Sequence, residues 1–153
     1  MNIFVLDKNP VVAASMMCDK HVVKMIVETA QMLCTVARNN GHEVPYRSTH
    51  KNHPCTLWAG ESRDNWIWLI THGLALCGEY TKRYGKVHKS VTVIDHCARL
   101  NMSFDKTEQT PFRLAMPPQY KQTCPVKSYR SYYKGEKSRF AKWKMGEPTW
   151  WRA

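Results

Sequence analysis

The strongest constraint on the fold is a helical repeat that runs from Asn9-Pro10 to Asn39-Asn40-Gly41. Apolar residues recur about every 3.6 positions along it, which predicts one buried helix face: Ala13, Met16, Val23, Ile26, Val27, Ala30, Leu33 and Ala37. Pro10 suits the first helical position, with Asn9 as the cap, and Gly41 suits the exit. We therefore expect one long helix behind a short extended arm, residues 1–8, whose apolar side chains dock on the core.

A second long helix is predicted from Pro54 to about Tyr84, with Gly85 as its stop. Its expected buried positions are Leu57, Ile67, Ile70, Leu74 and Cys77. Three glycines interrupt the pattern and are expected to mark close contacts between helices: Gly60, Gly73 and Gly78.

Shorter elements follow. A helix is predicted from Val91 to Leu100, a helical turn after Thr110-Pro111, and a last helix from Pro125, bent at Gly135, to about Trp143. Strand patterns are almost absent, and 153 residues suit one domain with its own core. The predicted fold class is all-α: a single compact domain, residues 1–153, of two long helices, shorter helices and the N-terminal arm.

The six cysteines do not indicate disulfides or a cysteine zinc site. No CxxC pair occurs, and Cys34 and Cys77 fall on apolar helix faces, which favours reduced, buried thiols. No run approaches the roughly 18 apolar residues of a membrane helix, and residues 1–6 do not resemble a signal peptide. We expect a cytoplasmic, monomeric protein with no membrane partner.

Charge points to a polyanionic partner. The formal net charge is +11, and residues 112–153 hold ten Lys or Arg against two Glu, a net +8. An excess concentrated in one quarter of the chain favours nucleic-acid binding over a role in solubility alone.

The first cluster of polar residues lies in the first long helix. His21, Lys24 and Glu28 are spaced i, i+3 and i+7, so one helix face carries all three. The simpler interpretation is a solvated face with a weak Lys24–Glu28 ion pair. The alternative is a functional site.

The second cluster is the loop His50-Lys51-Asn52-His53. It precedes the predicted second helix, where free backbone N–H groups favour a phosphate. We expect these side chains to line the same cleft as Glu28, the alternative being that the histidines only cap the loop.

The third cluster is the cationic turn of residues 82–89, with Arg83, Lys86, His88 and Lys89. Cations also suit the C-terminal end of a helix, so a solvated helix end is the alternative to a phosphate contact.

The fourth cluster, Tyr129-Arg130-Ser131-Tyr132-Tyr133-Lys134, interleaves aromatic and basic residues. Such residues contact phosphates and stack on unpaired bases, although tyrosines at helical spacing can equally belong to the core. The candidate nucleic-acid contacts are Lys20, His50, Lys51, His53, Arg83, Lys86, His88, Lys89, Arg130 and Lys134.

His50 and His53, together with His21, Glu28 or His88, are the residues that could form a metal site. No HExxH-type helix motif occurs, so we predict neither a metal nor another cofactor.

The first helix resembles the pyrimidine-dimer DNA glycosylases found in phages. In that family an Asp-x-His precedes the catalytic glutamate at the spacing of Asp19-x-His21-x6-Glu28. The region Arg83-Tyr84-Gly85…His88-Lys89-Ser90 is similar to the end of the family's second helix, and Pro148-Thr149-Trp150 resembles a Pro-Thr-Trp near its C-terminus. If the chain is encoded by a phage, we expect the protein in the cytoplasm of the host cell.

The resemblance implies an all-α enzyme that binds duplex DNA, extrudes a base and combines glycosylase with abasic-site lyase chemistry. In the family the N-terminal α-amine attacks the sugar C1′ and forms an imine. An α-amine, whose pKa is ordinarily about 7.7–8.0, is more available at neutral pH than Lys at about 10.4. Glu28 would match the glutamate that moves a proton, and His21 and Lys24 would hold phosphates.

One departure from the family concerns the nucleophile. The family's chains lose Met1 before a small residue, whereas residue 2 here is Asn. We therefore expect the amine of Met1 to take the role, with Lys24 as the alternative. Two other functions stay open: a different enzyme acting on a modified base or nucleotide through His21, Glu28, His50 and His53, and a non-enzymatic nucleic-acid-binding protein.

Overall fold

The computed structural model describes residues 1–152, which fold into six α-helices and two 3-10 helices with no β-strand among them. The helices are α1 (Pro10–Met16), α2 (Asp19–Asn39), α3 (Pro54–Glu61), α4 (Arg63–Tyr84), α5 (Val91–Ala98), η1 (Pro118–Tyr120), α6 (Pro125–Glu136) and η2 (Thr149–Trp151). The all-α prediction is confirmed. None of the described helices is long and apolar enough to cross a membrane.

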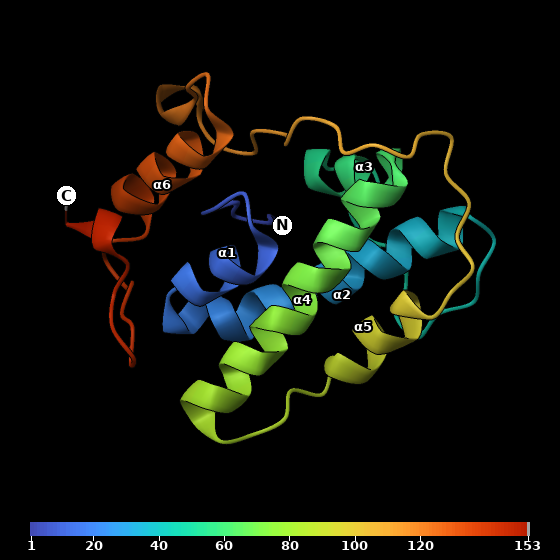
Figure 1. The fold of residues 1–153 in the computed structure, drawn as a ribbon, viewed down its shortest axis with the longest axis horizontal. Helices are drawn as coiled ribbons and strands as arrows, with labels where there is room; N and C mark the ends of the chain where they lie inside the picture. Colours follow the sequence, from blue (N-terminus) through green and yellow to red (C-terminus); the bar gives the residue numbers. More distant parts are fainter. Residues whose placement is uncertain (153) are drawn as a thin grey trace.

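Helix α4 is the centre of the packing, because α1, α2, α3 and α5 all contact it (Figure 1). Gly73 permits this arrangement: a Cβ atom there would lie 2.9 Å from Thr29 Cγ2 and 3.1 Å from Ile94 Cδ1. The close contact expected at Gly73 is therefore confirmed, whereas a Cβ at Gly78 would meet no other group within 4 Å.

The predicted buried faces are only partly correct. Five apolar residues assigned to them are exposed: Val23, Val27, Leu57, Ile67 and Leu74. Ile70 and Cys77 are buried as expected. Each long prediction had combined two helices of different direction, so a single apolar stripe could not describe both.

The first predicted helix breaks at Met17–Cys18. Both residues have extended backbone, and the N–H groups of residues 18 and 19 bond to distant segments: Cys18 N–H donates to the Tyr133 hydroxyl at 3.0 Å and Asp19 N–H to the Lys142 carbonyl at 2.8 Å. The break thus depends on residues more than 100 positions away, which the local pattern does not contain.

The second predicted helix breaks at Ser62. This residue is extended, with φ −151° and ψ 161°, and its hydroxyl accepts the N–H of Asn65 at 3.1 Å as the N-cap of α4. Serine is a favoured N-cap residue, so this break did have a local signal.

The last predicted helix is shorter than expected. Helix α6 ends at Glu136 instead of near Trp143, and no helical turn follows Pro111; the 3-10 turn lies at Pro118–Tyr120 instead. Beyond α6 the chain returns to the start of α2, where Lys144 N–H donates to the Asp19 carboxylate at 2.9 Å.

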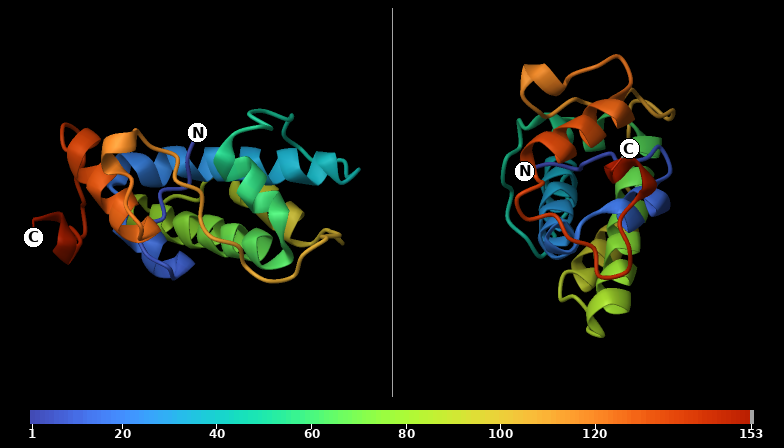
Figure 2. Two further views of the ribbon diagram at one scale, coloured as in Figure 1. Left: turned by 90° about the horizontal axis from the view of Figure 1, so that it is seen from above. Right: turned by 90° about the vertical axis from the view of Figure 1, so that its left-hand side faces the viewer.

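The N-terminal arm docks on the core as predicted. Residues 3–6 are at most 3 % exposed, and the arm lies between α6 and the helices α1 and α2 (Figure 2). The cysteines are free thiols, as predicted, and all except the half-buried Cys124 are buried.

Candidate active site

The N-terminal amine and the Glu28 carboxylate form the centre of the site. The Met1 amine lies 3.3 Å from Glu28 Oε1, and the N–H of Asn2 donates to the same oxygen at 3.1 Å. Lys24, one helical turn before Glu28, places Nζ 3.8 Å from the other oxygen. The Glu28 side chain is only 11 % exposed. The interpretation of a solvated helix face is therefore wrong, because Glu28 and His21 are both buried.

A sharp turn in the arm brings the amine to Glu28. The Asn2 side-chain oxygen accepts the N–H groups of Ile3 and Phe4 at 2.8 and 3.1 Å, and its amide donates to the Ala115 carbonyl at 2.8 Å. Phe4 has a φ of 56°, a left-handed conformation that costs energy in a residue other than glycine. The packing around the arm therefore stabilises a backbone conformation at Phe4 that is unfavourable by itself.

His21 is enclosed by aromatic side chains. Its ring stacks on Phe4 at 4.6 Å and lies 5.3 Å from Phe140, and Nδ1 is 2.8 Å from the Tyr133 hydroxyl. Burial, with help from the charge of Lys137 and other lysines, lowers the pKa of His21 to about 3. His21 is thus neutral at physiological pH and does not supply the phosphate-binding cation that we expected.

Two neighbouring cavities open around these residues and share His21 and Lys24. The smaller, of about 120 Å³, contains the amine and Glu28 and is also lined by Phe4, Tyr132 and Lys137. The larger, of about 430 Å³, is lined by Lys20, His21, Lys24, Arg139 and Phe140. We call the two together the active-site cleft.

The cleft is strongly cationic, with Glu28 as the carboxylate in its lining. Lys137 lies over the ring of Tyr132 at 4.9 Å, and Lys20 lies over Phe140 at 5.2 Å. Burial and the nearby charge of Lys24 lower the pKa of Lys137. Such a cleft can bind the phosphates of a strand while its amine and carboxylate face the sugar.

Lys137, Arg139 and Phe140 are among the cleft residues that were missed from the sequence. The net charge of residues 112–153 included the two cations, but no motif marked them as a site. Only the fold brings this segment, which directly follows α6, against α2.

The residues of the loop 50–53 lie in different surroundings in the structure. His53 is half-buried, and its pKa is lowered by burial and by the charge of the N-terminal amine, but it is not among the residues that line the active-site cleft. His50 is exposed and pairs with the Thr49 hydroxyl at 2.8 Å. Lys51 lines a separate cavity with Arg113, so the prediction of a shared cleft is wrong for this lysine.

Arg83 also needs correction. We expected it among the DNA contacts, but it is buried and makes ion pairs with Asp19 at 3.2 Å and Glu79 at 2.9 Å. It also donates to the carbonyls of Met17 and Ser15, at 2.7 and 3.1 Å. Its guanidinium holds the α1–α2 break on α4 and is not available to a phosphate.

The rest of the third cluster is more open. Lys86 and Lys89 are exposed after Gly85, whose left-handed backbone ends α4 as predicted. His88 is half-buried, and its Nδ1 accepts the N–H of Ser90 at 3.1 Å. None of these three residues lines the active-site cleft.

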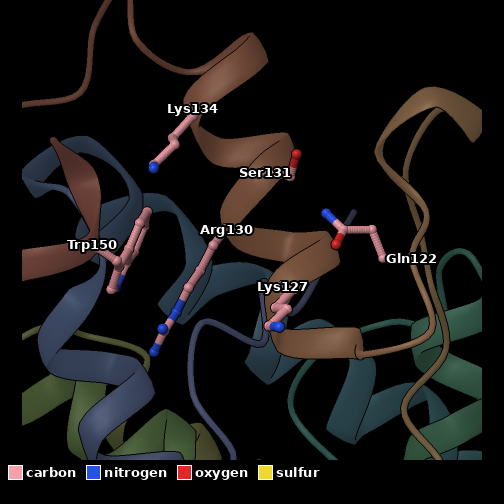
Figure 3. Close-up of a pocket in the computed structure, with 6 residues that line it drawn as sticks. All are labelled: Gln122, Lys127, Arg130, Ser131, Lys134 and Trp150. Carbon is pink, nitrogen blue, oxygen red and sulfur yellow. The ribbon is translucent and has the colours of Figure 1, made fainter. Parts of the chain in front are cut away.

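The fourth cluster faces in two directions. Tyr129 and Tyr133 are core residues, while Tyr132 lines the active-site cleft. Arg130 and Lys134 instead line another cavity of about 300 Å³, which we call the α6 cavity (Figure 3). Its other lining residues are Gln122, Lys127, Ser131 and Trp150.

Arg130 also has an internal role beside the α6 cavity. Its Nε donates to the Leu6 carbonyl at 2.8 Å, and its guanidinium lies 5.3 Å from the centre of the Trp150 ring. Within residues 1–152, no three His, Cys, Asp or Glu side chains gather in a way that could hold a metal ion.

Comparison with known proteins gives one family. A family model described as pyrimidine dimer DNA glycosylase matches residues 1–93. Comparison with curated proteins and with solved structures gave no match. The matched segment contains the amine, Lys24 and Glu28, while Tyr132, Lys137, Arg139 and Phe140 lie outside it.

Proposed function

This chain belongs to the pyrimidine dimer DNA glycosylase family, and from that premise we propose that it excises a damaged pyrimidine from DNA and then cleaves the abasic site, with the α-amine of Met1 as nucleophile. The observation that carries the proposal is the 3.3 Å distance between this amine and Glu28 Oε1. An amine must lose a proton to act as a nucleophile, and a carboxylate within hydrogen-bond reach can accept it.

The reaction follows from these two groups. The amine nitrogen bonds to the sugar C1′ as the bond from C1′ to the base breaks, and the base leaves with the electron pair and takes up a proton. Opening of the sugar ring then gives an imine between residue 1 and C1′. Loss of a proton from C2′ breaks the C3′–O bond and releases the 3′ strand, and water finally hydrolyses the imine. Glu28 is the group placed to move protons in these steps.

The cleft supports a DNA substrate with an extruded nucleotide. Lys20, Lys24, Lys137 and Arg139 offer four cations for phosphates, and the larger cavity, of about 430 Å³, has the Phe140 ring in its wall. A base extruded from a duplex loses its stacking partners, and an aromatic ring can replace one of them.

The deciding test is covalent trapping with borohydride on DNA that contains an abasic site. Borohydride reduces an imine to a stable amine, so an enzyme of this type leaves a protein–DNA adduct, whereas a protein that only binds DNA leaves none. The alternative enzyme, which acts on a base without forming an imine, would also leave no adduct. A chelator added to the reaction should not change the yield of adduct.

Glu28→Gln tests the role of the carboxylate. The amide oxygen can still accept from the Met1 amine and from Asn2 N–H, so we expect stability and DNA affinity to change by less than about 1 kcal/mol each. Turnover should fall by about 10²-fold or more, as is usual on losing a general acid–base group.

Lys24→Ala is the control for Glu28→Gln. It should weaken DNA binding and leave the trapped adduct in place. Unchanged turnover in Glu28→Gln would show that the site is assigned wrongly, and loss of the adduct in Lys24→Ala at saturating DNA would transfer the nucleophile to Lys24.

A further inference from the structure

Asn2 connects the N-terminal amine to a segment far along the chain. The residue is only 7 % exposed and belongs to the lining of the smaller cavity of the active-site cleft. Its backbone N–H donates to Glu28 Oε1 at 3.1 Å, and the same oxygen lies 3.3 Å from the Met1 amine. The position of residue 2 therefore determines how the amine meets the carboxylate.

The side-chain amide of Asn2 is bound on both of its sides. Its Oδ1 accepts the N–H groups of Ile3 and Phe4, at 2.8 and 3.1 Å, and its Nδ2 donates to the Ala115 carbonyl at 2.8 Å. A backbone N–H only donates and a carbonyl only accepts, so these contacts need an oxygen at one end of the side chain and an N–H at the other. An amide has both groups, whereas a carboxylate of the same size has no donor.

The Ala115 carbonyl is itself fixed by Tyr129 of α6. The Tyr129 hydroxyl accepts the N–H of Ala115 at 3.2 Å and donates to the Arg113 carbonyl at 2.5 Å. Tyr129 is fully buried, and its ring packs edge-on against Phe4 with 6.4 Å between ring centres. Residues 113–115, which we call the clamp segment, are thus bound to α6 on one side and to Asn2 on the other.

The turn at the start of the arm depends on such contacts. Phe4 has a φ of 56°, and a residue other than glycine adopts this conformation only when its surroundings stabilise it. The hydrogen bonds of Asn2 to the N–H groups of Ile3 and Phe4 and to the clamp segment stabilise the turn. If the bond to Ala115 is lost, the turn can relax and move the amine relative to Glu28.

We propose that Asn2 is a positioning residue of the reaction, which holds the Met1 amine beside Glu28 through its contact with the clamp segment and Tyr129. This inference rests on the proposed function above. The clamp segment and Tyr129 lie beyond residue 93, where the family match ends, so the second part of the chain completes the geometry of an amine that the first part supplies. Misplacing a reacting group by about 1 Å can cost up to about 10²-fold in rate, so the contact has a measurable effect.

Asn2→Asp removes the donor and keeps the acceptor. Its carboxylate can still accept from Ile3 and Phe4 but cannot donate to the Ala115 carbonyl. Aspartate, like asparagine, is not a small residue, so Met1 stays in place, and the mass of the intact protein checks this. The added charge favours the protonated amine, an effect that disappears at alkaline pH, whereas a misplaced amine is slow at every pH.

Tyr129→Phe breaks the same connection without adding a charge. It deletes the hydroxyl that fixes Ala115 and leaves Asn2 itself unchanged. Tyr46→Phe is the matched control, because it also deletes one tyrosine hydroxyl. The Tyr46 hydroxyl lies 2.7 Å from the Ser90 hydroxyl, in a contact between the loop before α3 and the start of α5.

The experiment measures the single-turnover rate of borohydride trapping on preformed abasic DNA at saturating protein, from about pH 6.5 to 9.5. Asn2→Asp should lower the rate at least about tenfold over the whole range, and Tyr129→Phe at least about threefold. Tyr46→Phe should trap within about twofold of wild type. Kd and Tm are measured separately, and both Phe variants should keep Kd within about twofold and lower Tm by about 5 °C or less.

Each outcome has a defined meaning. No adduct from the wild-type protein overturns the proposed function and this inference together. A wild type that traps, with Asn2→Asp equally fast, overturns the positioning role alone. An Asn2→Asp rate that returns to the wild-type value at alkaline pH also overturns it, because the added charge then explains the loss, as does a Tyr129→Phe no slower than Tyr46→Phe. If Asn2→Asp does not fold, the comparison of Tyr129→Phe with Tyr46→Phe decides by the same criterion.

Discussion

His21 and His72 are both buried without charge, and each should make the fold sensitive to acid. Burial is the main cause that lowers their pKa, to about 3 for His21 and about 4 for His72. In the unfolded chain each ring takes up a proton near pH 6.5, so the unfolded state binds more protons than the folded state below that pH. The contribution of the two neutral rings to the free energy of unfolding is therefore fully present above pH 6.5 and is lost as the pH falls.

The prediction is a fall in the free energy of unfolding of up to about 1.4 kcal/mol per pH unit for each histidine between pH 6.5 and 5. Urea unfolding at several pH values measures it. His21→Gln and His72→Gln should each reduce the slope, while His96→Gln, on the exposed face of α5, should leave it unchanged. An equal slope in all three variants would mean that neither buried ring is responsible.

At the scale of residues, the sequence could predict one half of the site. The i, i+3, i+7 spacing placed His21, Lys24 and Glu28 together, because a helix repeats regularly. The contact of Glu28 with Met1 depends on a left-handed turn at Phe4, a residue type that gives no signal for such a turn. Long-range packing decides that conformation.

Arg83 shows how an element boundary is stabilised from a distance. Helices α1 and α2 meet at an extended link, and the buried guanidinium binds Asp19 at the start of α2 together with two carbonyls of the preceding segment. The sequence pattern predicted one continuous helix because none of these contacts is local. The break at Ser62, which carries its own N-cap, could have been predicted.

Replacing Arg83 should therefore affect stability and not DNA binding. For Arg83→Met we expect a loss of about 3–5 kcal/mol in the free energy of unfolding, since Asp19 and Glu79 would lose a buried partner. Lys86→Met, at an exposed position just beyond α4, should change it by less than about 0.5 kcal/mol. Denaturant unfolding of both variants measures the difference, and a stable Arg83→Met that binds DNA less tightly would restore Arg83 to the DNA contacts.

For the whole molecule, the positive charge is the feature that the sequence predicted most directly. The count of cations indicated a polyanionic partner, but it did not show which of them share a surface. The fold places Lys20, Lys24, Lys137 and Arg139 around the active-site cleft, while Lys127, Arg130 and Lys134 line the α6 cavity. Charge alone cannot separate these groups, because the segments that carry them approach one another only in the fold.

This division predicts the salt dependence of DNA binding. If about five phosphates are neutralised, log K should fall against log [salt] with a slope of about −4 to −5. Lys20→Ala and Arg139→Ala should each reduce the slope by about one, and Lys127→Ala should not. A slope near zero would remove the electrostatic argument, and an equal effect of Lys127→Ala would extend the DNA contacts to the α6 cavity.

The central claim is that the amine of Met1 forms the bond to DNA. The most direct measurement is tandem mass spectrometry of the borohydride-trapped complex after digestion of protein and DNA. We predict that the sugar remnant lies on the α-nitrogen of the peptide that begins with Met1. A remnant on the side chain of Lys24 or Lys137, or an N-terminal peptide that is unmodified in a trapped complex, would contradict the account.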